Sequence, residues 1–298
     1  MQMKLVAKRI SGIVASGLLA LSLSFQSAQA LTVGGKNFTE QQLIAEITTQ
    51  LLASKGIVAE KKVGLGSVVL RQAQENGQID IYWEYTGTSL ITYNKINDKL
   101  SADETYKRVK ELDGARGLVW LNPSRANNTF ALAMRRADAD AKNIHSLSDL
   151  AKAIKGGANL SLASNAEFAA RPDGLKPLQE TYGFEFSRDN IRRMDSGLTY
   201  QALKERQVDV SLVFATDGRV PAFDLYILKD DKGFFPAYAL TPVIRKQAND
   251  ANPKIAGILN ALSAKLDDSI MSKLNASVDV EKNTIEAVAA KFLKDSGL

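Results

Sequence analysis

Two stretches of the chain, Gln78–Thr88 and Gln207–Gly218, each end a short apolar run on an aromatic residue that Thr and Gly follow closely. Tyr85 lies seven residues after Gln78, and Phe214 lies seven residues after Gln207. Short apolar runs bounded by turn residues favour strands, and ligands of open α/β sheets sit beyond the carboxyl ends of the strands. The two stretches therefore predict two lobes that each offer an aromatic ring to a shared cleft.

Two more aromatic residues, Phe130 and Tyr238, lie where the chain is expected to pass between the two lobes. Taken singly, each of the four rings is better explained by packing than by ligand contact. Taken together, they would converge on the cleft. Several rings that face one point attract a quaternary ammonium group, which has no N–H to donate and binds through cation–π contact.

Basic residues lie at comparable positions. Lys36 follows the first expected strand, and Arg171 follows the strand expected at residues 160–163. Either side chain could bind a carboxylate at the other end of such a ligand. Solvated surface charge is the alternative interpretation of both, and the sequence leaves it open.

The elements that must position these residues follow an α/β plan. Residues 32–63 predict strand, helix and strand; residues 68–83 add a helix and a third strand, and residues 148–214 repeat the plan. Such an order implies parallel strands joined by right-handed crossovers. Thr39 with Gln42, and Ser101 with Glu104, have the form of capping boxes at helix starts. Residues 253–298 predict three further helices.

The last helices need a sheet to cover, and the first block is the nearest one. The chain is therefore expected to cross between lobes near Asn128–Leu132 and to return near Ala237–Pro242. This predicts one lobe from residues 31–129 and 239–298 and a second lobe from residues 130–238. Two crossings form a hinge that can open and close around a ligand.

Residues 1–30 have the features of a secretory signal peptide. Lys4, Lys8 and Arg9 precede an apolar run at Ile13–Phe25, and Ala28-Gln29-Ala30 forms a small-x-small cleavage site. The run is short for a membrane anchor, which is the alternative, because a span needs about 20 apolar residues. Cleavage near Ala30 and a location in a bacterial periplasm are expected.

Composition excludes several classes of function. The formal net charge is +5, and removal of residues 1–30 takes away three basic residues and no acidic one, which leaves +2. Without a dense basic cluster, this argues against binding to nucleic acid or a membrane surface. The chain has no cysteine, which excludes disulfides, thiol catalysis, thiolate metal sites and a lipid anchor on cysteine.

Few residues favour an enzyme. His145 is the single histidine, so a Ser-His-Asp arrangement would have to use it, and no His, Asp or Glu cluster has metal-ligand spacing. Gly64 and Gly66 lack the remaining features of a dinucleotide site. No cofactor is expected. A secreted hydrolase that uses Glu84 or Asp217 as acid and base is the remaining catalytic alternative.

Five motifs resemble those of the osmoprotectant-binding proteins of ABC importers, in particular their stationary-phase or hyperosmotic-stress branch. The motifs are Lys-Asn-Phe-Thr-Glu at 36–40, Tyr-Trp-Glu-Tyr-Thr-Gly-Thr at 82–88, Asn-Asn-Thr-Phe-Ala-Leu at 127–132, Ala-Thr-Asp-Gly at 215–218 and Phe-Phe-Pro-Ala-Tyr at 234–238. The resemblance covers essentially all of residues 31–298. It implies a two-lobed periplasmic binding protein of the type II fold, which acts as a monomer and delivers a ligand to an ABC permease and its ATPase.

The resemblance also implies which residues bind the ligand. Two of the family's four cage tyrosines fall on Tyr85 and Tyr238, and the other two fall on Phe130 and Phe214, which keep a π face but lose the hydroxyl. Its polar partners fall on Lys36, Thr88, Arg171 and the backbone at Asn128. Glycine betaine is the expected ligand. Choline, carnitine or an amino acid on the same scaffold remains an alternative, and so does a sensor that signals to a receptor.

Overall fold

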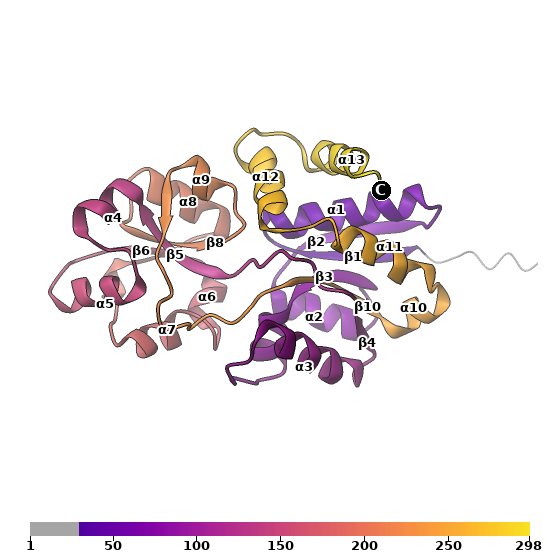
Figure 1. Ribbon diagram of the computed structural model, residues 1–298, viewed down its shortest axis with the longest axis horizontal. Coiled ribbons are helices and arrows are strands. Elements are labelled where there is room, and N and C mark those ends of the chain that lie inside the picture. Colours follow the sequence, from indigo (N-terminus) through magenta and orange to yellow (C-terminus); the bar gives the residue numbers. More distant parts are fainter. Residues whose placement is uncertain (1–29) are drawn as a thin grey trace, which may run out of the picture.

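The computed structural model describes residues 30–298, which form two lobes with one five-stranded sheet in each (Figure 1). Of the predicted signal peptide, only Ala30 falls within the described residues, so that prediction lies outside them. Helices flank both sheets, and the architecture is the mixed α/β fold that the sequence predicts.

The first sheet has the strand order β2-β1-β3-β10-β4. Its strand β1 pairs in parallel with β2 and β3, as the predicted alternation of strands and helices requires, whereas β10 runs antiparallel to β3 and β4. The strands are β1 (Leu31–Lys36), β2 (Ala59–Leu65), β3 (Ile81–Tyr85), β4 (Leu118–Trp120) and β10 (Leu240–Arg245). The helices of this lobe are α1 (Thr39–Ser54), α2 (Ser67–Glu75), the π-helix η1 (Thr88–Tyr93), α3 (Ala102–Gly114), α10 (Lys246–Ala251), α11 (Lys254–Ser263), α12 (Asp268–Asp279) and α13 (Ile285–Ser296).

The second sheet has the order β7-β6-β8-β5-β9 and follows a similar plan. Its strand β6 is parallel to β7 and β8, and β5 is antiparallel to β8 and β9. The strands are β5 (Phe130–Arg135), β6 (Leu162–Ser164), β7 (Ile191–Arg193), β8 (Val210–Phe214) and β9 (Leu225–Ile227). The helices are α4 (Arg136–Lys142), α5 (Leu147–Lys155), α6 (Ala166–Ala170), α7 (Leu175–Tyr182), the 3-10 turn η2 (Arg188–Asn190), α8 (Ser196–Lys204) and α9 (Arg219–Ala222).

Two extended segments connect the lobes, and they lie side by side. Asn127 forms a bridge with Ala239, the Asn128 N–H donates to the Tyr238 carbonyl at 3.2 Å, and the Tyr238 N–H donates to the Asn127 side chain at 2.7 Å. Each segment leads directly into a strand of the sheet it enters, β5 in the second lobe and β10 in the first. The backbone between the lobes is thus hydrogen-bonded, as it must be where it leaves both sheets.

Helix α1 is the central packing helix of the first lobe, because Leu43, Ile44, Ile47 and Leu51 recur at helical spacing and are all buried. It packs against β1 and β2 and against α13, α12 and α11 of the C-terminal part. Figure 1 shows the C-terminal helices, in yellow and orange, gathered over this lobe. These helices follow β10, which lies in the first sheet.

The two predicted capping boxes differ in outcome. The box at Ser101 and Glu104 is confirmed, with the Glu104 N–H bonded to the Ser101 hydroxyl and the Ser101 N–H bonded to the Glu104 carboxylate. The box at Thr39 and Gln42 is wrong, because α1 begins at Thr39 itself and Phe38 is the residue before it. The Thr39 hydroxyl instead donates to Asp279 of α12 at 2.8 Å.

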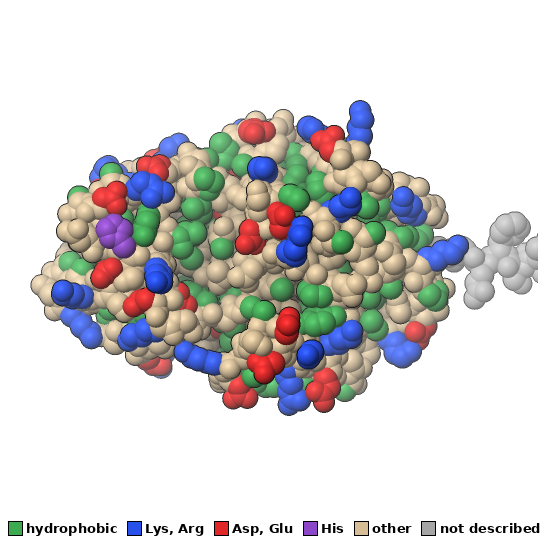
Figure 2. Space-filling view, in the orientation of Figure 1, with side chains coloured by type: hydrophobic (Ala, Val, Ile, Leu, Met, Phe, Trp, Pro, Cys, Tyr) green, Lys and Arg blue, Asp and Glu red, His purple; other side chains and the backbone are tan. Residues whose placement is uncertain are grey.

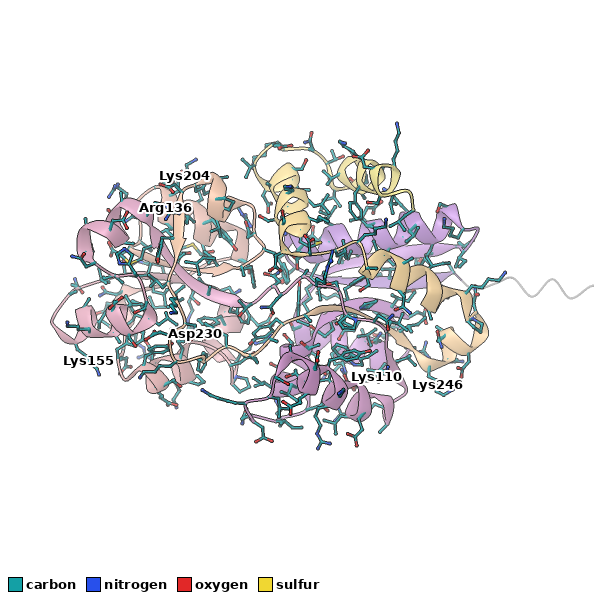
Figure 3. The ribbon with its side chains drawn as sticks, viewed as in Figure 1. Lys110, Arg136, Lys155, Lys204, Asp230 and Lys246 are labelled. Carbon is teal, nitrogen blue, oxygen red and sulfur yellow. The ribbon has the colours of Figure 1, made fainter. Side chains whose placement is uncertain are left out.

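On the face of the molecule in Figure 2, charge follows no single-sign pattern. Basic and acidic side chains are interspersed on the face shown in Figure 2, and the exposed Lys155, Lys204 and Lys246 lie at the periphery in Figure 3. Between residues 30 and 298, no helix combines the length and the apolar character that a membrane crossing requires.

Candidate ligand-binding site

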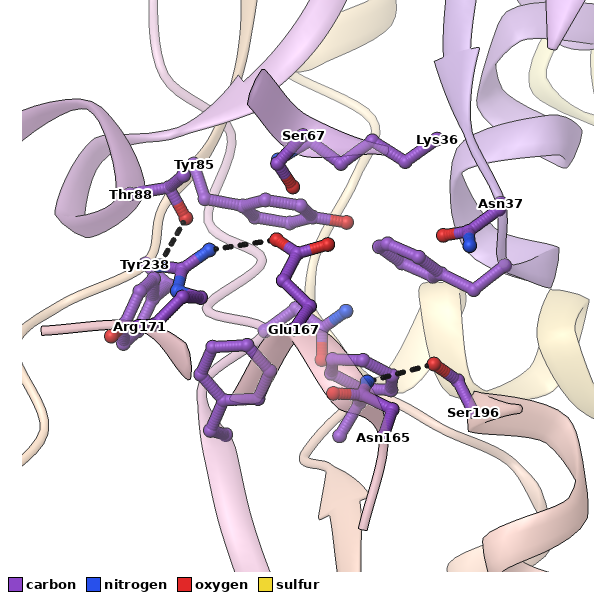
Figure 4. A pocket seen from close by; sticks show the side chains of 14 residues that line it. Lys36, Asn37, Ser67, Tyr85, Thr88, Asn165, Glu167, Arg171, Ser196 and Tyr238 are labelled. Carbon is purple, nitrogen blue, oxygen red and sulfur yellow. Dashed lines mark hydrogen bonds and ion pairs between the residues drawn. The ribbon is translucent and has the colours of Figure 1, made fainter. Parts of the chain in front are cut away.

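A cavity between the lobes is lined by all eight residues that the sequence singles out (Figure 4). Lys36, Tyr85 and Thr88 come from the first lobe, Arg171 and Phe214 come from the second, and the two connecting segments supply the rest, which are Asn128, Phe130 and Tyr238. Sequence reasoning did not predict six further lining residues: Asn37, Phe38, Ser67, Asn165, Glu167 and Ser196.

Strand register brings the predicted rings together. Because β5 is antiparallel to β8, its first residue Phe130 pairs with the last residue of β8, Phe214. In the other sheet, Leu240 of β10 pairs with Tyr85 at the end of β3, which brings Tyr238 to the same edge. Each crossing strand therefore starts where a parallel strand ends, and four aromatic residues separated by up to 153 positions meet at the boundary of the lobes.

The rings form one cluster, with Phe38 as an additional member. Phe38 stacks on Phe214 with ring centroids 4.9 Å apart and lies 6.3 Å from Tyr85. Phe130 lies 5.4 Å from Phe214 and meets Tyr238 edge-on at 5.8 Å. Phe38 belongs to the Lys-Asn-Phe-Thr-Glu motif just after β1, and its place after a strand end is the signal that could have identified it.

The two tyrosines are fixed by hydrogen bonds to carboxylates. Tyr85 donates its hydroxyl proton to Glu40 at 2.8 Å, and Tyr238 donates to Asp173 at 2.5 Å. Burial, together with the nearby carboxylates, holds the pKa of both phenols well above its usual range. Both rings therefore stay neutral and keep a defined orientation toward the cavity.

Glu40, at the start of α1, is a fully buried carboxyl behind Tyr85 that sequence reasoning missed. It also accepts hydrogen bonds from Asn128 of the first crossing segment at 2.9 Å, from Thr216 after β8 and from Asn275 of α12 at 3.1 Å. Burial raises the pKa of Glu40, and the hydrogen bonds from these neutral donors oppose that rise. This carboxyl therefore joins the two lobes at the side of the ring cluster.

Lys36 is buried against a carboxylate of its own lobe. Its ammonium Nζ lies 2.5 Å from Glu84 Oε1, and the side chain of Glu84 is 0% exposed. Tyr82 and Tyr93 donate to the other oxygen of Glu84 at 3.0 and 2.9 Å. Lys36 also lies 4.9 Å from the centre of the Tyr85 ring. Glu84 is therefore the buried counter-ion of Lys36.

Arg171 is likewise paired, because the guanidinium donates to both oxygens of Asp173 at 2.7 and 2.5 Å. It also donates to Thr88 of the other lobe at 3.2 Å and to Glu167 at 3.2 Å. Burial lowers the pKa of Arg171, but the paired carboxylates outweigh it and raise the pKa above its usual value. The guanidinium also packs 5.0 Å from the centre of the Phe130 ring.

Glu167 projects from α6 into the cavity toward Tyr85 and Arg171 (Figure 4). Asn165 caps this short helix by accepting from the Phe168 N–H at 2.7 Å, and its amide donates to the hydroxyl of Ser196, the first residue of α8, at 2.9 Å. Burial acts to raise the pKa of Glu167. The Lys36 ammonium, the Ser67 hydroxyl and Arg171 together outweigh burial, so the pKa lies below its usual value.

The residues proposed for the catalytic alternative do not line this cavity. Glu84 lies behind Lys36, and Asp217 is held by Arg219, which donates to both of its oxygens at 2.9 and 2.6 Å. The enclosed space is about 30 Å³, room for one or two waters. A trimethylammonium head is much bulkier than water, so the cavity must enlarge to take a ligand of that kind.

Comparison with known proteins extends these findings. The family OpuAC, the substrate-binding domain of ABC-type glycine betaine transport systems, matches residues 29–295. A glycine-betaine-binding protein of Pseudomonas aeruginosa is 48% identical over 289 residues, covering 95% of this chain and 92% of that protein. The glycine betaine-binding protein YehZ of Escherichia coli is 36% identical over 289 residues, covering 94% of this chain and 95% of that protein.

Solved structures agree with the sequence comparison. The structure of YehZ aligns with a TM-score of 0.67, covering 91% of this chain and 99% of that chain. A structure described as a glycine betaine/carnitine/choline ABC transporter is 28% identical and aligns with a TM-score of 0.73, covering 90% of this chain and 98% of that chain. The two-lobed fold is therefore the one that these binding proteins share.

Proposed function

Because the chain belongs to the OpuAC family of substrate-binding domains of ABC-type glycine betaine transport systems, we propose that it captures a quaternary-ammonium compatible solute for import. Glycine betaine is the proposed ligand. The observation that carries the proposal is the ring cluster, because aromatic residues from both lobes and both crossing segments line one cavity. Such a cluster attracts a methylated cation through cation–π contact and excludes water from it.

In this proposal the ammonium head lies among Phe38, Tyr85, Phe130, Phe214 and Tyr238. The ligand's carboxylate lies toward Arg171, Thr88 and Lys36, with the backbone at Asn128 as a further polar contact. Residues 31–129 with 239–298 form one lobe and residues 130–238 form the other. The ligand contacts both lobes, so it binds the closed form better and shifts the population toward closure.

The partners of such a protein are an ABC permease and its ATPase, to which the closed form delivers its ligand. The chain acts in the periplasm as a monomer after removal of the signal peptide near Ala30. It performs no catalysis of its own. Support for this comes from the family and from the buried ion pairs that occupy Glu84 and Asp217.

Calorimetric titration of the protein that starts at Leu31 tests the proposal. The panel of ligands consists of glycine betaine, choline, carnitine and proline. At least one of the quaternary ammonium compounds is expected to bind with a stoichiometry of one per chain, and proline is not expected to bind. The recovered ligand should be chemically unchanged. A panel in which no quaternary ammonium compound binds at millimolar concentration would refute the ligand assignment, and turnover of a bound ligand would refute the non-catalytic role.

A paired variant tests the place of the carboxylate. Arg171→Gln alone would leave Asp173 buried without its partner, so it is combined with Asp173→Asn. This double variant should weaken the binding of glycine betaine much more than the binding of choline, which has no carboxylate. Equal weakening of both ligands would show that the carboxylate does not lie at Arg171.

A further inference from the structure

Glu167 is the one carboxylate among the described residues that line the cavity. The two cations of the lining already have counter-ions without it. Lys36 is already matched by Glu84 at 2.5 Å, and Arg171 is already matched by Asp173 through two hydrogen bonds. With Glu167 added, two cations face three carboxylates, a net charge of −1. Glu40, behind Tyr85, is a further carboxyl that can only add negative charge.

The position of Glu167 lets its negative charge act on a bound ligand. The Glu167 carboxylate points into the cavity between Arg171 and Tyr85, and it lies 3.2 Å from Arg171 Nη1 (Figure 4). It therefore bonds to the same guanidinium that the ligand's carboxylate would use. Its side chain remains 34% exposed, so solvent moderates its field but does not remove it.

We propose, building on the function proposed above, that Glu167 is a specificity-determining residue that favours quaternary ammonium ligands of net positive charge over zwitterionic betaines. The Glu167 carboxylate attracts the methylated head of both classes. It repels the ligand carboxylate, which only the betaines carry, and it competes with that carboxylate for Arg171. The ratio of the two affinities therefore reports this residue directly.

The test compares glycine betaine with choline in calorimetric titrations of the same protein sample. Glu167→Gln keeps the shape and the hydrogen-bonding oxygen but removes the charge. The ratio of the dissociation constant for glycine betaine to that for choline should fall about tenfold, a change of about 1.4 kcal/mol. Because both constants come from one sample, a partly misfolded variant does not alter the ratio.

Two controls separate the local charge from other effects. Glu185→Gln removes an equal charge from an exposed position that does not line this cavity, and it should leave the ratio unchanged. Glu167→Asp keeps the charge and should retain a ratio close to that of the unmodified protein. Raising the salt concentration should move the unmodified protein toward the Glu167→Gln ratio, since the carboxylate is partly exposed.

An unchanged or increased ratio in Glu167→Gln would overturn this inference while leaving the proposed function intact. An equal shift in Glu185→Gln would overturn it too, because overall charge would then explain the effect. If neither ligand bound the unmodified protein, the proposed function would fail and this inference would fail with it.

Discussion

Aromatic side chains around the cavity are held in two different ways. Tyr85 and Tyr238 are anchored by their hydroxyl groups to buried carboxylates, whereas Phe38, Phe130 and Phe214 are held by contacts between rings. A ring held only by packing can shift without breaking a hydrogen bond. Phe38 and Phe214 are therefore the pair that we expect to adjust when a ligand enters.

Alanine substitutions test the rings one at a time. Phe38→Ala, Tyr85→Ala and Phe214→Ala should each weaken the best ligand of the panel by about 1–2 kcal/mol, the scale of a desolvated cation–π contact. Calorimetric titration measures the change. Phe223→Ala is the matched control, because Phe223 is a half-buried ring of the same lobe as Phe214 outside the cavity lining. A loss of similar size in the control would assign the effect to general destabilisation.

At the residue scale, the sequence predicted which residues line the site better than it predicted their ion-pair and hydrogen-bond partners. Phe130 and Phe214 were recognisable because each lies at a strand end, a local property. Glu84 could not be assigned to Lys36, because the two are 48 positions apart and meet only through the pairing of β1 with β3. The excess negative charge of Glu167 could not be predicted for the same reason. The net charge of a site can be counted only when every counter-ion is known.

Among the secondary-structure elements, a buried ion pair joins several parts of the first lobe. Asp113 of α3 accepts two hydrogen bonds from Arg71 of α2, and it also accepts from Ser89 of η1 and from the Trp120 indole of β4. Burial by itself raises the pKa of Asp113, but Arg71 and the other donors outweigh it and lower the pKa. The carboxylate thus holds these four elements together beside the sheet.

Removing this charge should destabilise the lobe. Asp113→Asn leaves the buried Arg71 with only the partly exposed Glu75 as a carboxylate partner and should lower the free energy of unfolding by up to about 3–5 kcal/mol at neutral pH. The lowered pKa means that the native pair stabilises the fold above the unfolded pKa of about 3.9 and loses this effect as pH falls through the folded pKa. The difference between the two proteins in urea unfolding should therefore shrink below about pH 4.

Glu111→Gln is the control for this prediction, since Glu111 lies on the same helix with its side chain 71% exposed. Its exposed pair with Arg108 should contribute about 0–1 kcal/mol at most. A constant difference between Asp113→Asn and the native protein down to pH 2 would contradict the role assigned to the ionised pair.

Most elements were predictable because their apolar spacing or their flanking turns are local signals. Helix α4 was missed because its sequence, Arg-Ala-Asp-Ala-Asp-Ala-Lys, has no apolar stripe and follows β5 without a break. The π-helix η1 was missed because it follows β3 after two residues. The capping box at Thr39 placed the start of α1 one residue late, since the partner of the Thr39 hydroxyl lies on α12, far along the chain.

On the scale of the whole molecule, the cavity belongs to neither lobe alone. The Arg171–Thr88 bond and the bond between Glu40 and Thr216 span the boundary between the lobes. The connecting segments at Asn127–Asn128 and Tyr238–Ala239 allow this boundary to change by rotation of a few residues. Ligand binding should therefore stabilise both lobes together.

Linked stabilisation can be measured directly. Ligand at 100 times its dissociation constant should raise the free energy of unfolding by about 2.7 kcal/mol. Hydrogen exchange should slow at the cavity-facing ends of α2 in the first lobe and α6 in the second. Protection confined to one lobe would contradict a ligand that bridges the two.

The contact between Phe38 and Phe214 also has a consequence for ligand release. When a solute departs, these two rings can close on one another, so that protein surface takes the place of the departing methyl groups and little bare hydrocarbon meets water. The empty site is then closed by its own rings, which favours release of the ligand to a permease over long retention of the ligand.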